Sequence, residues 1–279
     1  MADMESLRPP SLAGQKVVLA VPRRADIESV AAFCAQFGPQ VHAIAATGRL
    51  LMAHGAGIIR TMKDAGATRV YADAKLHDTP DEAEDAAKLI WDAGADMLSV
   101  HGAGTGIMVQ RAVSTAPTGC RVVVVTLLTS ITSNMAKAVY GRELPFDEIV
   151  GSLARIAGME HVWGVTCSPK EADMLRRNFT SLKRVIYAAR FRDAIHDSVY
   201  DQRRLGTLRE GVLAQGDLFG IGRDVTGAVS LDADKEVRAA GWQQAFDEVC
   251  TAMHAAEAER TAQVERKSTA PQLAVAVGE

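Results

Sequence analysis

The chain has 279 residues, 48% of them hydrophobic and 23% charged, which is typical of a globular protein with a sizeable core. Its 31 lysines and arginines and 34 aspartates and glutamates give a formal charge of −3 at pH 7. This balance excludes a general electrostatic attraction to nucleic acid or to an anionic membrane surface. The longest apolar run, at 122–128, spans seven residues, whereas a transmembrane helix needs roughly 20.

Cysteine usage and the first residues indicate the cellular compartment. The segment MADMESLRPPSLAG lacks the apolar core of a secretory signal. The cysteines form neither a C-x-x-C pair nor a metal-binding spacing, and their positions are Cys34, Cys120, Cys167 and Cys250. We therefore expect a cytoplasmic protein with reduced thiols that requires no metal or other cofactor.

Short runs rich in valine and isoleucine alternate with amphipathic segments along the chain. Most of these runs lack a polar alternation, as expected of parallel strands that are covered on both faces. The predicted strands are 15–21, 40–46, 69–74, 96–101, 121–128, 161–167, 183–189 and 217–221. The predicted helices are 25–37, 50–65, 80–93, 106–114, 146–157, 169–178, 207–215 and 232–256.

Strict alternation of eight strands and eight helices predicts an α/β fold, a (β/α)8 TIM barrel. An open, doubly wound sheet is the alternative, although the sequence contains no signal for the reversal point that such a sheet needs. We expect one barrel domain at 15–256 after an N-terminal extension at 1–14. The segment 257–279 mixes charge, alanine and proline without a clear period and is predicted to be a disordered tail.

The end of the third predicted strand, YADAKLHDTPDE, contains the main candidates for chemistry. Asp73 and Lys75 are two residues apart and therefore share a face of the strand, and Asp78 follows in the loop. Thr79 is the expected N-cap of the next helix, with Glu82 completing a capping box. A buried lysine paired with carboxylates keeps its proton and can deliver it to a carbanion. The alternative is a structural ion pair at the barrel mouth.

The motif DAKLHDTP, followed by the strand GADMLSVH, resembles the D-x-K-x-x-D motif of the orotidine 5′-monophosphate decarboxylase family. The resemblance covers about residues 15–255 and implies a barrel with lyase activity. Its further segments are KVVLAVPRRADIES, VVVVTLLTSIT, WGVTCSPKEADMLR and DQRRLGTLREGVLAQGDLFGIGRDVTGA.

The resemblance implies a role for each matching residue. Lys75 would donate a proton to the carbon that loses its carboxylate, with Asp73 beside the scissile group. The resemblance also implies a homodimer with shared active sites. Asp78 would then reach the site of the neighbouring subunit. Gly222 and Arg223, after strand eight, would bind a substrate phosphate, which agrees with the usual phosphate site of this fold.

Further residues are expected near the substrate. Thr132 or Ser130 falls where the family places a hydroxyl close to the base ring. Gln202 belongs to the segment that resembles the phosphate-binding end of the family. His101 ends strand four at the barrel mouth and either binds a substrate oxygen or packs. His42, on the second strand, is a candidate substitute for a missing lysine.

Several arginines follow strand seven and form either a lid over an anionic ligand or a solvated basic face. Arg192 is expected to contact the substrate. The alternative interpretation of Arg223 is an exposed arginine of a loop. The arginines of this group are Arg190, Arg192, Arg203 and Arg204.

The sequence departs from the family at two strands. Ala20 replaces an aspartate that binds ribose hydroxyls at the end of the first strand. Ala45, or Ile44 in a one-residue shift, replaces a lysine of the second strand. Lys75 with Asp73 and Asp78 then has a net charge of −1, which should repel a substrate carboxylate.

These observations lead to one main hypothesis and two alternatives. The main hypothesis is a diverged lyase of the decarboxylase type that acts on a phosphorylated nucleotide or sugar. The first alternative keeps the barrel and its ligand class but changes the reaction to C–C cleavage, isomerisation or hydrolysis. The second is a non-catalytic barrel that binds a nucleotide.

Overall fold

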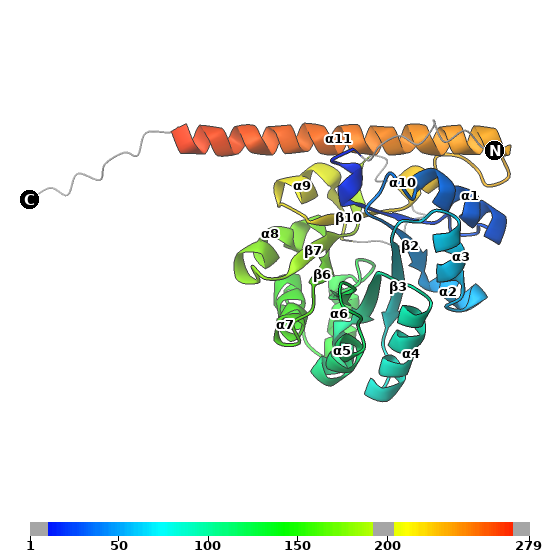
Figure 1. Ribbon diagram of the computed structural model, residues 1–279. Coiled ribbons are helices and arrows are strands. Elements are labelled where there is room, and N and C mark those ends of the chain that lie inside the picture. The colour runs from blue at the N-terminus through cyan, green and yellow to red at the C-terminus, as the bar shows by residue number, and fades with distance from the viewer. Residues whose placement is uncertain (1–10, 192–203, 270–279) are drawn as a thin grey trace, which may run out of the picture.

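The computed structural model describes residues 11–191 and 204–269. Within these residues, eight parallel strands close into a barrel in the order β1-β10-β7-β6-β5-β4-β3-β2 (Figure 1). Because β1 pairs with both β2 and β10, the barrel prediction is confirmed and the open sheet is excluded. The strands are β1 (Val17–Ala20), β2 (Ala43–Thr47), β3 (Val70–Leu76), β4 (Met97–His101), β5 (Arg121–Val125), β6 (Gly164–Cys167), β7 (Lys183–Ile186) and β10 (Leu218–Ile221).

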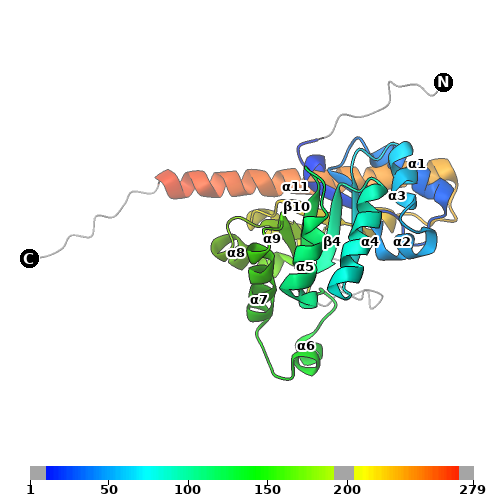
Figure 2. The ribbon, with the colours of Figure 1, turned by 60° about the horizontal axis from the view of Figure 1, so that its bottom comes forward.

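Helices surround the barrel (Figures 1 and 2). Short 3₁₀ helices at Gly14–Lys16 and Gly102–Gly104, and a small parallel pair of β8 (Ala189–Arg190) and β9 (Gly206–Thr207), complete the described structure. The α-helices are α1 (Ile27–Phe37), α2 (Gly48–His54), α3 (Ile58–Asp64), α4 (Pro80–Asp92), α5 (Thr105–Ser114), α6 (Ser133–Tyr140), α7 (Phe146–Met159), α8 (Pro169–Asn178), α9 (Leu208–Leu213), α10 (Arg223–Thr226) and α11 (Lys235–Thr269).

The barrel strands are buried on both faces, which explains their continuous apolar sequences. Their outward side chains join the large core beneath the helices, and their inward side chains form a smaller cluster inside the barrel. Ala43 and Ala45 of β2 pack with the large side chain of Tyr71 on β3 in that interior cluster. Side chains are expected to fill the interior of a barrel of eight strands. The inner cluster consists of Val18, Ala43, Ala45, Tyr71, Met97, Val123, Val185 and Leu218.

Two of the predicted helices differ from the sequence-based expectation, and α6 and α10 were not predicted. The helix predicted at 50–65 is divided into α2 and α3 because Gly55, with φ 67°, ends the first segment. The last helix, α11, continues to Thr269, so the disordered tail predicted from residue 257 is wrong for the described part of that segment. Alanine, glutamate, arginine and glutamine favour a helix there.

Helix α11 lies along one side of the barrel and extends beyond it (Figures 1 and 2). Its first half packs on α1 through ring contacts of Trp242 with Phe33 and of Phe246 with Phe37. Farther along, Glu259 forms an ion pair with Arg209 of α9. In the described part of the chain, no helix is both long and apolar enough to cross a membrane.

Candidate active site

A lysine and an aspartate form an ion pair at the C-terminal end of β3. The Nζ atom of Lys75 lies 2.5 Å from Oδ2 of Asp73. The Asp73 side chain is only 10% exposed, whereas that of Lys75 is 42% exposed. The carboxylate is therefore fixed inside the barrel mouth, and the ammonium reaches from it toward solvent, as the period-two spacing predicted.

An irregularity in β3 positions Lys75. The pairing of β3 with β4 shifts between Ala72 and Leu76, and Lys75 adopts a left-handed backbone with φ 51°. This conformation costs roughly 1–2 kcal/mol in a residue other than glycine. The hydroxyl of Ser99 on β4 accepts the Lys75 N–H at 2.8 Å and donates to Oδ1 of Asp73 at 3.0 Å. Ser99 thus links the backbone of one member of the ion pair to the side chain of the other.

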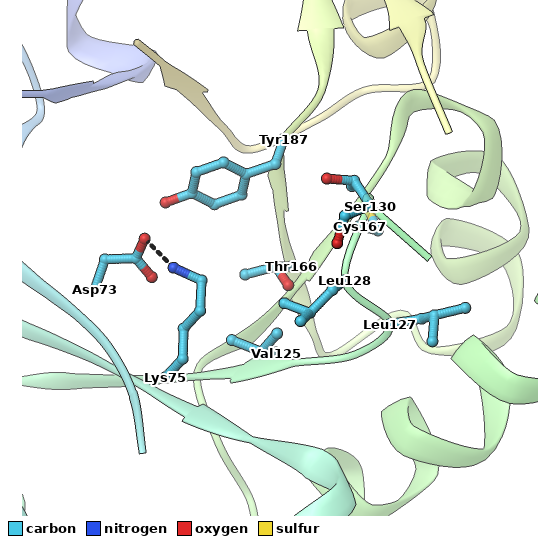
Figure 3. A pocket seen from close by; sticks show the side chains of 10 residues that line it. Asp73, Lys75, Val125, Leu127, Leu128, Ser130, Thr166, Cys167 and Tyr187 are labelled. Atoms are coloured by element: carbon cyan, nitrogen blue, oxygen red, sulfur yellow. Dashed lines mark hydrogen bonds and ion pairs between the residues drawn. The ribbon is translucent and has the colours of Figure 1, made fainter. Parts of the chain in front are cut away.

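The ion pair faces a cavity of about 380 Å³ that opens at the barrel mouth (Figure 3). The cavity combines a charged side, provided by β3, with a mainly apolar side from β5, β6 and the loop after β5. Such a site excludes water from part of its wall and strengthens the electrostatic interactions within it. Its lining residues are Asp73, Lys75, Val125, Leu127, Leu128, Thr129, Ser130, Thr166, Cys167 and Tyr187.

A second, smaller pocket of about 170 Å³ lies beside the first. Arg23, Arg190 and Arg223 line it, and among the described residues its acidic lining residue is Asp224, which forms an ion pair with Arg190 at 3.7 Å. The described lining residues, with three guanidinium groups and one carboxylate, together have a positive charge. Arginine groups in this arrangement suit a phosphate. The remaining lining residues include Ala20, Thr47, Gly220, Gly222 and Thr226.

Tyr187 lines both pockets, and its hydroxyl is directed toward Asp73 and Lys75 (Figure 3). A Cβ atom at Gly220 would lie 2.3 Å from the Tyr187 ring, so glycine makes room for this ring. Burial and the charge of Asp73 raise the pKa of Tyr187 and also that of Tyr71. Neither hydroxyl makes a hydrogen bond within the described residues. Both phenols therefore remain protonated near Asp73 at neutral pH.

Residues 16–240 match the model of the orotidine 5′-phosphate decarboxylase / HUMPS family. The chain belongs to this family. The resemblance seen in the sequence is thereby confirmed, and the protein is an enzyme of the carboxy-lyase type.

Individual relatives agree with this assignment. The orotidine 5′-phosphate decarboxylase of Anaeromyxobacter dehalogenans is 34% identical over 210 residues, covering 75% of this chain and 90% of the relative. That of Thermobifida fusca is 30% identical over 220 residues, covering 78% and 92%. The fold is similar to the crystal structure of the Lactobacillus acidophilus orotidine 5′-phosphate decarboxylase, with a TM-score of 0.65 and 22% identity over 84% of this chain and 99% of that chain.

Among the hydroxyl residues expected near the substrate, Ser130 lines the cavity together with its neighbour Thr129. Thr132 is instead the N-cap of α6, where its hydroxyl accepts the N–H of Met135 at 3.3 Å. Thr132 is therefore used in ending the loop after β5, and α6 itself was not predicted.

Asp78 does not join the ion pair within one subunit. It is exposed and absent from the cavity lining, and its Oδ1 atom accepts the N–H of Thr79 at 2.7 Å. Thr79 is the N-cap of α4 but makes no side-chain capping bond, so the expected capping box with Glu82 does not form. Asp78 instead accepts the N–H of Thr79 at the start of α4. Without Asp78, the ion pair of Asp73 and Lys75 at the cavity is electrically neutral.

His101 lies at the end of β4 but not among the residues that line the cavity. Its ring stacks on that of His77 at 5.1 Å, and its Nδ1 atom accepts the N–H of Ala103 at 3.1 Å. Burial, with the neighbouring His77 and Lys75, lowers the pKa of His101 to about 4. The ring is therefore neutral at pH 7 and shapes the β4 loop.

His42 precedes β2 and thus lies at the opposite end of the barrel from Lys75. Its Nε2 atom is 3.1 Å from Nη1 of Arg121, and burial with Arg69 and Arg121 lowers its pKa to about 4. The suggestion that His42 substitutes for a lysine of the second strand is therefore wrong, because strand direction separates the two ends.

The arginines after strand seven have different environments. Arg204 is buried, donates to the carbonyl of Leu127 at 2.8 Å and stacks over Phe146, so it is neither a lid nor a solvated face. Arg190 lines the smaller pocket. Three residues of the expected substrate-binding segment lie outside the described residues, namely Arg192, Gln202 and Arg203.

The register of β2 corrects one detail of the comparison with the family. Thr47 lies opposite Asp73, whereas Ala45 lies one level deeper and Ile44 faces the outer core. The residue beside the ion pair is therefore a threonine, and a lysine is absent from this position in either case. Ala20 lines the smaller pocket and leaves its wall apolar at that point.

Sequence reasoning missed Ser99, Thr166 and Tyr187. Ser99 is a polar residue within an apolar strand, two residues before His101 and on the same face, which is a detectable signal. Tyr187 directly follows Val185 and Ile186, the two apolar residues that end β7, and therefore reaches the barrel mouth. Among the described residues, no group of three or more histidines, cysteines or acidic residues has the geometry of a metal site.

Proposed function

We propose that this enzyme is a lyase acting on a phosphorylated nucleotide or sugar, and that Lys75 protonates the carbon from which the leaving group departs. The observation that carries the proposal is the ammonium of Lys75, held 2.5 Å from Asp73 at the edge of the 380 Å³ cavity. A preorganised ammonium beside a partly apolar wall stabilises negative charge that develops on a bound carbon.

The neighbouring pocket supports a phosphate-bearing ligand. Arg23, Arg190 and Arg223 give it a net positive charge, and Tyr187 lines both pockets. A phosphate bound there places the rest of the ligand beside Lys75. Binding energy from the phosphate then serves to orient the reacting carbon.

The proposed reaction requires only the enzyme, its substrate and water. The bond between the substrate carbon and its carboxylate breaks, carbon dioxide departs, and the electron pair stays on the carbon. Lys75 donates a proton to this carbon and becomes a neutral amine, which regains a proton from water. Asp73 keeps the ammonium oriented before the transfer.

One observation favours a second candidate reaction on the same ligand class. No second lysine and no arginine lies among the described residues that line the larger cavity, and Thr47 stands opposite Asp73. A substrate carboxylate there would approach Asp73 with a single cation, Lys75, to offset the repulsion. Cleavage of an uncharged group or isomerisation avoids this repulsion.

A direct assay decides between the two candidates. We expect the purified enzyme to convert orotidine 5′-monophosphate to uridine 5′-monophosphate, followed as the loss of the orotate ultraviolet band. Heat-inactivated protein is the control. An unchanged band, with uridine 5′-monophosphate still bound in a calorimetric titration, contradicts decarboxylation of this substrate and favours the second candidate.

We also propose a homodimer in which Asp78 completes the site of the partner subunit. Asp78 is exposed and lies outside the cavity of its own subunit, although it is only three residues from Lys75. A two-fold dimer with β3 ends at its interface provides a place for this carboxylate.

Mixing two inactive variants tests the shared site. Lys75→Ala and Asp78→Ala are each expected to be inactive, while an equal mixture that is unfolded and refolded together regains about a quarter of the wild-type sites. The reason is that half of the dimers are mixed and each holds one intact site. Sedimentation analysis checks the dimer, and a mixture that stays inactive contradicts the proposal.

A further inference from the structure

The hydroxyl of Ser99 occupies an unusual position between two functional groups. Ser99 is completely buried on β4, and its oxygen lies 2.8 Å from the backbone nitrogen of Lys75 and 3.0 Å from Oδ1 of Asp73. A backbone N–H can only donate and an ionised carboxylate can only accept. The hydroxyl hydrogen of Ser99 must therefore point to Asp73, and its lone pair to Lys75.

This arrangement compensates for the irregularity of β3. The ladder between β3 and β4 is interrupted between Ala72 and Leu76, so the Lys75 N–H has no regular strand acceptor. Ser99 itself stays paired with Val123 of β5 through its backbone, and its side chain replaces the missing acceptor. This hydrogen bond offsets part of the energetic cost of the left-handed backbone conformation of Lys75.

The same hydroxyl also orients the carboxylate. Oδ1 of Asp73 accepts from Ser99, and Oδ2 accepts from the ammonium of Lys75 at 2.5 Å. Each carboxylate oxygen thus has one partner, which fixes rotation about the last bond of the side chain. Ser99 therefore acts on Lys75 at two points. It binds the backbone N–H of Lys75 directly, and it orients the Lys75 ammonium through Asp73.

We propose that Ser99 is a positioning residue for the reaction, because its hydroxyl fixes the bulged backbone of β3 and the Asp73 carboxylate so that the Lys75 ammonium faces the cavity. This inference rests on the proposed role of Lys75 as proton donor. Without the hydroxyl, a buried N–H and a buried carboxylate oxygen both lose a partner. The backbone of Lys75 is then free to leave its left-handed conformation, which moves the ammonium away from Asp73.

The test compares Ser99→Ala and Ser99→Thr with wild type by crystal structure and by steady-state kinetics. In Ser99→Ala we expect a changed Lys75 backbone, a broken ion pair with Asp73, and a kcat about 100-fold lower with little change in KM. Ser99→Thr retains the hydroxyl and restores kcat to within a few-fold.

Thr115→Val is the matched control. The Thr115 hydroxyl likewise accepts from one N–H, that of Trp91 at 3.1 Å, and donates to one oxygen, that of Ala112 at 2.8 Å, but on the outer helices. Its loss should lower stability without lowering kcat or breaking the ion pair between Asp73 and Lys75. Should Ser99→Ala fail to fold, Ser99→Cys, which keeps the volume and weakens the donor, enters the same comparison.

The outcomes separate this inference from the proposed function. An unchanged Asp73–Lys75 pair in Ser99→Ala, or a kcat within twofold of wild type, overturns the positioning role while the lyase proposal stands. If the wild-type enzyme is inactive on every phosphorylated substrate tried, the lyase proposal fails, and the crystal structure of Ser99→Ala alone decides whether Ser99 positions the pair.

Discussion

Replacing Lys75 with alanine is expected to lower kcat by about 1,000-fold and to leave KM nearly unchanged. A positioned acid contributes roughly 10²–10⁴ to the rate of a proton transfer, and the ammonium of Lys75 is the one cation among the described lining residues of the larger cavity. In the proposed binding mode the arginines of the smaller pocket hold the phosphate, so we expect ground-state affinity to persist. Steady-state kinetics and calorimetric titration with uridine 5′-monophosphate measure the two effects.

Two further variants separate proton transfer from charge. Lys75→Arg retains a cation beside Asp73, but a guanidinium does not release its proton, so kcat should stay low. Lys63→Ala removes a comparable ion pair, with Asp96 at 2.6 Å near the N-terminal end of the strands, and should leave kcat within twofold of wild type. Recovery of activity in Lys75→Arg would instead indicate purely electrostatic stabilisation.

The barrel was predictable because its signal repeats along the whole chain. Each predicted strand overlaps an observed one, since parallel strands covered on both faces need continuous apolar sequences. The errors concern local boundaries and the two short helices α6 and α10, which were not predicted. Gly55 ends α2 inside an apparently continuous helical pattern, and α11 continues past its last core contacts because its residues favour a helix by themselves.

The site was predictable only where one strand determines it. The period of β3 places Asp73 and Lys75 together without any knowledge of the other strands. The residues that complete the site depend on the register between strands, which the sequence does not contain. Thr47 beside Asp73 and Ser99 beside both are examples, because each lies on a different strand from the pair.

A buried ion pair connects the stability of the barrel to the shape of the cavity. Glu171 of α8 is 2% exposed, accepts the N–H of Ser168 at 2.9 Å and lies 3.7 Å from the guanidinium of Arg204. The guanidinium of Arg204 in turn donates to the carbonyl of Leu127 at 2.8 Å. The backbone N–H of Arg204 donates to the carbonyl of Thr129 at 3.0 Å. Leu127 and Thr129 are part of the cavity wall, so this buried arginine holds the loop after β5 in place.

Replacing Glu171 with alanine is expected to lower the free energy of unfolding by about 3–5 kcal/mol, because it leaves the Arg204 charge buried without its partner. Urea denaturation followed by circular dichroism measures the loss. Asp173→Ala is the control on the same helix, since Asp173 is also paired with arginines but is 46% exposed, and should cost less than about 1 kcal/mol. Equal losses of unfolding free energy in the two variants would contradict the proposal that Glu171 stabilises the buried charge of Arg204. Because the same contact supports the loop after β5, Glu171→Ala should also weaken the binding of uridine 5′-monophosphate at temperatures where the variant remains folded.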